Sequence, residues 1–170
     1  MIHKSMIGSK ILAIEYFLPK KKENNKIFKM HNPKVNIDRI KEKTGINNRY
    51  ISGENETVID ISVKAIKKIL KKFPKKKIDF LILVSQTSNF RIPTSACIIQ
   101  NRLNLRKDII AFDINLGCSG FIYALRMASS LIESKQVSNG IIVCADTYTK
   151  QISRTNTACR PIFSDDAAAK

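Results

Sequence analysis

The sequence predicts a layered α/β domain with a mainly parallel sheet. Three apolar runs of six or seven residues begin at positions 78, 109 and 140, so their starts are 31 residues apart each time. Near-continuous apolar runs are typical of strands that are buried on both faces, as in parallel sheets. The stretches between the runs are long enough for the crossovers that parallel strands require.

Each apolar run is a candidate strand. The three runs are IDFLILV (78–84), IIAFDI (109–114) and GIIVCA (140–145). The opening stretch from Met6 to Leu18 is a fourth candidate, because it is mostly apolar and Pro19 follows it.

Helices are predicted between these strands. Residues 57–73 carry apolar side chains on one face and lysines elsewhere, and Pro74 follows them. Residues 94–103 follow Pro93, with the Thr94 hydroxyl as the expected cap of the helix. Residues 121–132 also have apolar side chains at helical spacing. No flexible linker divides the chain, so we expect one domain.

The net charge of +16 raises the alternative of a nucleic-acid or membrane-surface binder. The lysines are spread along the chain, with short clusters at 20–22, 71–72 and 75–77. No aromatic residues alternate with these clusters, as they do where bases stack on a single-strand binder. We therefore expect a solvated lysine-rich surface and no nucleic-acid or membrane partner. Tight binding to DNA that weakens steeply with salt would favour the alternative.

The apolar runs and the cysteines indicate the cellular compartment and whether a metal site is expected. The apolar runs are far shorter than the roughly 18 residues of a membrane-spanning helix, and no signal peptide is recognisable at the start. We expect a cytoplasmic protein whose four cysteines are free thiols. The histidines, His3 and His31, are far from every cysteine, and there is no C-x-x-C motif. We predict no metal and no cofactor.

One cysteine lies where chemistry is expected. In open α/β sheets, sites lie just beyond the carboxyl ends of the strands. Cys118 follows the second apolar strand and directly precedes a helix, on a turn with Gly117, Ser119 and Gly120. A helix amino terminus stabilises a thiolate, and its free N–H groups can hold an oxyanion. Cys118 is therefore a candidate nucleophile, and the alternative is a small buried turn residue.

The other cysteines have weaker claims. Cys97 lies within a predicted helix and Cys144 within a predicted strand, so we interpret both as inert core thiols. Cys159 lies in a polar segment that favours neither role.

The segment around Cys118 resembles a known family. The run AFDINLGCSGFIYAL (111–125) is similar to the active-site segment of the ketoacyl-acyl-carrier-protein synthase III enzymes. Three further segments occur in the order of that family, namely KTGINNRYI (43–51), PTSACIIQNRLNL (93–105) and RPIFSDDAAA (160–169). The resemblance implies a thiolase-like fold with a mainly parallel five-stranded sheet. It further implies that residues 1–170 are the amino-terminal half of such an enzyme, cut within its last strand, with the carboxy-terminal half absent.

The resemblance also implies a reaction. Cys118 is expected to take an acyl group from acyl-coenzyme A and to pass it to malonyl-acyl-carrier protein, for fatty-acid or related acyl-chain synthesis. The full-length enzyme is expected to be a homodimer, and an acidic carrier protein would be attracted by the basic surface. Other thiolase-fold enzymes, which make hydroxymethylglutaryl-coenzyme A or polyketide starters, share this cysteine. Acyl-chain specificity is therefore left open.

Some functional residues of the family are missing. The family uses a His and an Asn from its second half, and neither His3 nor His31 corresponds to that His. The isolated chain is therefore expected to lack full activity. The alternative is a non-catalytic fragment or subunit that pairs with a partner carrying both residues.

The coenzyme A site is expected to differ from that of many relatives. Arg39 and Lys43 occupy the positions of a Trp and an Arg, and Arg154 or Arg160 is expected to contact a phosphate. The alternative is that all four are surface charges. Residues 163–166 read FSDD where relatives have FGDG, so we expect a different loop geometry.

Overall fold

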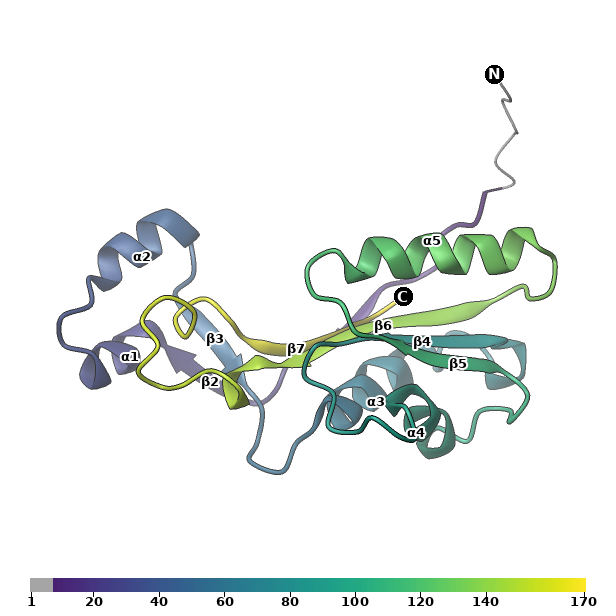
Figure 1. Cartoon of the computed structure of the whole chain (residues 1–170), viewed down its shortest axis with the longest axis horizontal. Coiled ribbons are helices and arrows are strands. Elements are labelled where there is room, and N and C mark those ends of the chain that lie inside the picture. The colour runs from purple at the N-terminus through teal and green to yellow at the C-terminus, as the bar shows by residue number, and fades with distance from the viewer. Residues whose placement is uncertain (1–7) are drawn as a thin grey trace, which may run out of the picture.

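The computed structural model describes residues 8–170, and its centre is a mixed five-stranded sheet in the order β1-β7-β6-β4-β5 (Figure 1). Strand β4 pairs in parallel with both β5 and β6, whereas β7 is antiparallel to β6 and to β1. The prediction of an α/β fold with a five-stranded sheet is confirmed. The strands are β1 (Glu15–Phe17), β4 (Phe80–Val84), β5 (Ile110–Ile114), β6 (Gly140–Thr147) and β7 (Asp165–Ala169).

The three apolar runs form the three parallel strands. Phe80 pairs with both Ile110 and Gly140, so the first residues of the three strands are in register. Every residue of β4 is buried, as expected for a central parallel strand. Strand β5 is only half-buried along its length, because it lies at the edge of the sheet.

The prediction of a long first strand is wrong. Met6 and Ile7 lie outside the described residues, and residues 8–14 form no regular structure. Only Glu15–Phe17 forms a strand, because β1 pairs with β7 alone and β7 offers partners only from Ala167 to Ala169.

Helix α3 (Val58–Ile69) begins with a capping box. The Thr57 hydroxyl accepts a hydrogen bond from the Asp60 backbone N–H, and the Asp60 carboxylate accepts one from the Thr57 backbone N–H. The helix ends four residues before the predicted end at Phe73.

The predicted cap of α4 (Ser95–Arg102) is wrong. The Thr94 side chain makes no capping hydrogen bond, and its buried hydroxyl has no partner within residues 8–170. Instead, the Asp113 carboxylate of β5 accepts hydrogen bonds from the backbone N–H groups of Ser95 (2.9 Å) and Ala96 (2.8 Å). A carboxylate on the neighbouring strand therefore satisfies the first turn of this helix.

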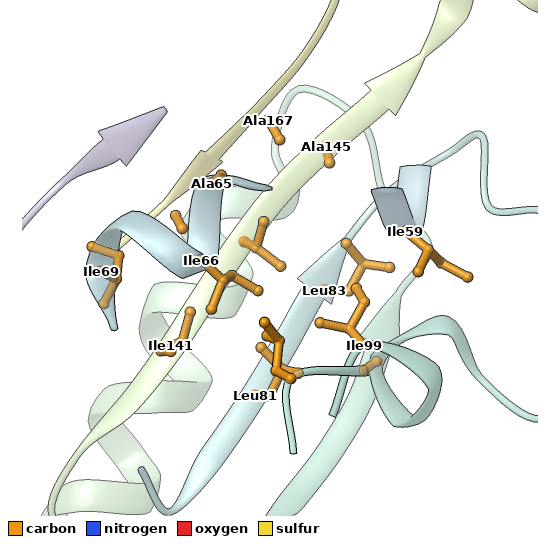
Figure 2. Close-up of a cluster of buried hydrophobic side chains, with 14 of the residues drawn as sticks. Ile59, Ala65, Ile66, Ile69, Leu81, Leu83, Ile99, Ile141, Ala145 and Ala167 are labelled. Carbon is orange, nitrogen blue, oxygen red and sulfur yellow. The ribbon is translucent and has the colours of Figure 1, made fainter. Parts of the chain in front are cut away.

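The two faces of the sheet are covered differently (Figure 1). Helices α3 and α4 cover one face and enclose the larger core, part of which Figure 2 shows. Helix α5 (Gly120–Glu133) covers β4, β5 and β6 on the other face, where it buries only Gly120, Ala124 and Ala128. No helix among residues 8–170 is long and apolar enough to cross a membrane.

A small lobe extends from one end of the main sheet (Figure 1). It contains the antiparallel pair β2 (Lys21–Asn24) and β3 (Asn48–Ile51) and the helices α1 (Asn25–His31) and α2 (Ile37–Thr44). The loop of residues 151–164 contacts this lobe, because the Asn25 side chain donates to the Pro161 carbonyl and Asn32 to that of Arg154. Short 3-10 turns at Lys75–Lys77 and Tyr148–Lys150 complete the chain.

Candidate active site

Cys118 lies at the carboxyl end of the parallel strands, as predicted. Strand β5 ends at Ile114 and α5 begins at Gly120 (Figure 1). Cys118 therefore stands on the connecting turn, and its side chain is exposed. The alternative that Cys118 is a buried structural residue is therefore not supported.

Both glycines of the turn lie in close contact with neighbouring side chains. A Cβ atom on Gly120 would lie 2.4 Å from Val84 Cγ1, so only glycine lets the start of α5 approach β4 this closely. A Cβ atom on Gly117 would lie 2.4 Å from the Gln86 side-chain oxygen. The Gln86 amide therefore lies directly against the backbone that precedes Cys118.

The turn leaves backbone donors free beside the sulfur. The Gly120 N–H donates to the Gly117 carbonyl at 2.7 Å and closes the turn. The N–H groups of Cys118 and Ser119 have no partner among the described residues. Free N–H groups at a helix amino terminus attract negative charge. The turn can therefore stabilise a thiolate or an oxyanion.

Asp146, at the end of β6, organises the loop beneath this turn. One of its carboxylate oxygens accepts from the backbone N–H groups of Gln86 (2.8 Å) and Thr87 (3.0 Å). The same oxygen accepts from the hydroxyls of Ser85 (3.1 Å) and Thr87 (2.8 Å). These four donors tie the loop after β4 to β6 and hold the Gln86 backbone in one place.

Tyr148 contacts the Gln86 side chain next to the Cys118 turn. Its ring stacks on Phe163 with the centroids 4.8 Å apart, and its hydroxyl donates to the Gln86 side-chain oxygen. Burial raises the pKa of Tyr148, and the charges of Asp146 and Cys118 raise it further. The phenol therefore stays protonated at neutral pH and keeps its hydrogen to donate.

The other cysteines are less accessible than Cys118. Cys97, Cys144 and Cys159 are each partly buried, and all four cysteines are free thiols. Burial raises the pKa of the Cys144 thiol, although Lys170 acts in the opposite direction. Cys97 donates weakly to the Ala111 carbonyl, with the sulfur 3.8 Å from the oxygen.

Arg39 and Lys43 are brought together, away from Cys118 in the small lobe. They stand one turn apart on α2 and line a shallow hollow of about 710 Å³, together with Asn36, Asp38 and Glu42. No side chain of α2 is buried, so this helix presents most of its surface to solvent.

The structure separates the two candidate arginines of the loop 151–164. Arg154 is exposed. Arg160 is buried, and its guanidinium donates to the carbonyls of Thr149 and Ile152. Burial lowers the pKa of Arg160. Its hydrogen bonds tie Thr149 and Ile152 to the loop, whereas the Arg154 side chain is open to solvent.

In the FSDD segment, the two residues that replace glycine, Ser164 and Asp166, have different surroundings. The Ser164 hydroxyl accepts from the Tyr50 backbone N–H at 2.8 Å and donates to the Tyr50 carbonyl at 3.0 Å, which ties the loop to β3. Asp166 is exposed on β7, where it pairs with Asp146 across the ladder. Between them, Asp165 is fully buried and accepts from the backbone and hydroxyl groups of Ser52 and Thr149.

The sequence analysis missed Gln86, Asp146 and Tyr148 as parts of the site. Asp146 lies at the end of β6, and Gln86 and Tyr148 lie just beyond the ends of β4 and β6, at the edge where parallel strands place functional residues. Their position after the apolar runs at 78–84 and 140–145 is the sequence signal by which they could have been found. The search for metal ligands among residues 8–170 finds no group of three or more suitable side chains.

Comparisons with known proteins agree with this geometry. The sequence profile of the 3-oxoacyl-[acyl-carrier-protein] synthase III family matches residues 112–170. A beta-ketoacyl-[acyl-carrier-protein] synthase III of Clostridium perfringens is 35% identical over 96% of this chain and 50% of its own length. A putative 3-oxoacyl-[acyl-carrier-protein] synthase 3 of Campylobacter jejuni is 36% identical over 78% of this chain and 38% of its own.

Solved structures show the same fold. The 3-oxoacyl-[acyl-carrier-protein] synthase III of Aquifex aeolicus superposes with a TM-score of 0.88 at 32% identity, over 95% of this chain and 52% of the other. A second solved synthase III gives a TM-score of 0.89 at 34% identity, over 94% and 48%. The chain thus has the thiolase-like fold of these enzymes and spans about half their length. It belongs to the 3-oxoacyl-[acyl-carrier-protein] synthase III family.

Proposed function

We propose that this chain carries the acyl-accepting site of a synthase III-type acyltransferase, with Cys118 as the nucleophile. The observation that carries the proposal is the exposed Cys118 thiol on the β5–α5 turn, beside backbone N–H groups without partners among residues 8–170. Membership of the family supports the same assignment.

The first half-reaction uses this turn. The Cys118 thiolate attacks the thioester carbonyl of an acyl-coenzyme A, and the free N–H groups stabilise the oxyanion that forms. The carbon–sulfur bond to coenzyme A then breaks. The acyl group stays on Cys118, and the released coenzyme A thiolate takes a proton from solvent.

The second half-reaction forms a carbon–carbon bond. Malonyl-carrier protein loses carbon dioxide, and the electron pair left on its α-carbon attacks the acyl carbonyl on Cys118. The bond between that carbonyl carbon and the Cys118 sulfur breaks, which frees the ketoacyl product. This step needs donors for the developing enolate, and the family takes them from a His and an Asn in its second half.

Arg39, Lys43 and Arg154 are proposed to hold the phosphates of coenzyme A. Arg39 and Lys43 line one hollow on α2, and Arg154 lies on the loop that contacts the small lobe. Their positive charges attract phosphate, and a planar guanidinium at Arg39 can also stack on a purine.

Release of coenzyme A tests the proposal. A folded polypeptide of residues 1–170 is mixed with acyl-coenzyme A, and the free thiol and the acylated protein are measured together. We expect one acyl group per chain, none with Cys118→Ala, and an unchanged yield with the control Cys159→Ala. Equal acylation of wild type and Cys118→Ala would refute the assignment.

A second candidate function is that of a subunit which docks a partner carrying the missing His and Asn. The exposed face of α5 favours it, because Ile122, Tyr123 and Met127 are 63%, 59% and 43% exposed. An apolar face of this kind marks an interaction surface.

Condensation tests the docking role, whereas acylation of Cys118 tests the nucleophile. Release of labelled carbon dioxide from malonyl-carrier protein is measured with the 170-residue chain alone and after addition of a second-half polypeptide from a relative. We expect no condensation by the chain alone and restored condensation by the pair. Robust condensation by the chain alone would contradict the need for a second half.

A further inference from the structure

We infer that Gln86 is a further catalytic residue of the Cys118 site, and that Tyr148 is the positioning residue that orients its amide. In this arrangement the Gln86 amide N–H groups donate to the reacting atoms at Cys118. The inference rests on the proposed function and extends it to two residues outside the β5–α5 turn.

The position of Gln86 is set by its backbone and by Gly117. The Asp146 carboxylate holds the Gln86 N–H at 2.8 Å, so the residue has little freedom at its base. Its side-chain amide lies on Gly117, where a Cβ atom would meet the amide oxygen at 2.4 Å and the amide nitrogen at 3.0 Å. Glycine at position 117 therefore creates the space that the amide fills, next to Cys118.

The orientation of the amide is set by Tyr148. The Tyr148 hydroxyl donates to the Gln86 amide oxygen, and the stack on Phe163 holds the phenol ring in place. The oxygen is thereby engaged as an acceptor, and the two N–H donors of the amide have no partner within residues 8–170. The Gln86 side chain is exposed, and an amide donor that reaches the Cys118 sulfur from this position can stabilise the negative charge on the sulfur and then on the acyl oxygen.

The chemistry of the residue type limits its role. A carboxamide neither gains nor loses a proton at physiological pH, so Gln86 acts as a neutral donor and not as a general base. The Tyr148 hydroxyl must keep its hydrogen in order to donate to the Gln86 oxygen, and the protonated phenol meets this requirement.

Gln86→Met tests the donor. Methionine keeps the length of the side chain and removes both N–H groups, and Gln136→Met is the matched control on an exposed residue after α5. We expect Gln86→Met to slow acylation of Cys118 by about five- to tenfold at neutral pH, whereas Gln136→Met leaves the rate unchanged. We expect Tyr148→Phe to slow it by about two- to fivefold, because the amide loses its fixed orientation.

The pH profile of Cys118 alkylation gives a second readout that needs no acyl substrate. Iodoacetamide labelling of Cys118 should reach half its maximal rate at a higher pH in Gln86→Met than in wild type, since a donor to the thiolate has been lost. Thermal melts and circular dichroism establish that each variant is folded.

The outcomes separate this inference from the proposed function. If wild type takes no acyl group, the proposed function fails, and the alkylation profile still decides whether Gln86 serves the sulfur. If wild type is acylated but Gln86→Met matches Gln136→Met in both acylation rate and alkylation profile, Gln86 has no such role.

Discussion

The two faces of the main sheet differ in what they bury. On one face, α3 and α4 enclose side chains such as Ile61, Leu83 and Ile99, all of which are fully buried. On the other face, α5 lies alone (Figure 1). Its side chains Ile122 and Tyr123 are exposed. The first face, here called the closed face, buries a large apolar core. The second, here called the open face, leaves apolar side chains of α5 in contact with solvent.

This difference suggests that one face of the sheet contributes mainly to the stability of the fold and the other mainly to its function. Backbone pairing aligns β4, β5 and β6 so that their carboxyl ends meet at one edge, and the core of the closed face packs beneath them. The open face begins at that edge with the Cys118 turn and continues as the apolar surface of α5. Substitutions on the closed face should therefore act on folding, and substitutions on the open face on chemistry or docking.

The largest expected effect on stability belongs to the closed face. Leu83→Ala should lower the free energy of unfolding by about 2–5 kcal/mol, because it leaves a cavity between β4 and the helices. Met127→Ala, on the exposed side of α5, should change it by less than about 0.5 kcal/mol. Urea denaturation of both variants checks the contrast. Similar losses would show that the open face is also covered in solution.

A smaller effect is expected for the cysteine beneath the open face. Cys144→Ser should cost about 1 kcal/mol, since a hydroxyl replaces a partly buried thiol on β6. Cys118→Ala should leave the melting temperature nearly unchanged, because its side chain is exposed. Equal losses of thermal stability from the two substitutions would mean that Cys118 has a structural role.

The cap of α3 should contribute less than the core beneath it. Thr57→Ala removes the hydroxyl that accepts from the Asp60 N–H and should cost about 1 kcal/mol. Thr155→Ala, in the exposed loop 151–164, serves as a control for loss of a threonine hydroxyl. If chemical denaturation finds the same stability for both variants, the capping box is not formed in solution.

The pH dependence of Asp60 is expected to be the smallest effect. Burial acts to raise the pKa of Asp60, but hydrogen bonds from Thr57 and the ion pair with Arg102 outweigh it and hold the pKa below its ordinary value of 3.8. The ionised carboxylate therefore stabilises the fold fully above that value, and this contribution is lost as the pH falls through the lower, folded-state pKa.

Asp60→Asn isolates this contribution. Its stability deficit relative to wild type should be complete at neutral pH and should shrink below pH 3.8. A deficit that persists unchanged into strong acid would exclude the charge of Asp60 as its origin.

Hydrophobic periodicity was sufficient to predict the parallel core and the Cys118 turn. The runs at 78–84 and 140–145 became the central strands β4 and β6, where both faces must be apolar, and the run at 109–114 became the edge strand β5. The small lobe could not be predicted in this way. Strand β2 reads KKEN, which has no apolar pattern to detect, and the short helix α2 buries no side chain.

Long-range polar contacts were also beyond the sequence. Asp113 lies inside an apolar strand, and only the fold reveals that its carboxylate caps α4. Arg160 resembled a phosphate ligand until the structure placed it in the interior. The partners of Asp113 lie 18 and 17 residues away in the chain and those of Arg160 lie 11 and 8 residues away, so the spacing of a helix or strand encodes neither contact.

The reactivity of the cysteines tests the central claim most directly. The folded wild-type chain is labelled briefly with iodoacetamide, and the modified peptides containing Cys97, Cys118 and Cys144 are quantified. We expect Cys118 to be labelled first, because it alone combines an exposed thiol with a helix amino terminus. Equal labelling of the three cysteines in protein shown to be folded would contradict it.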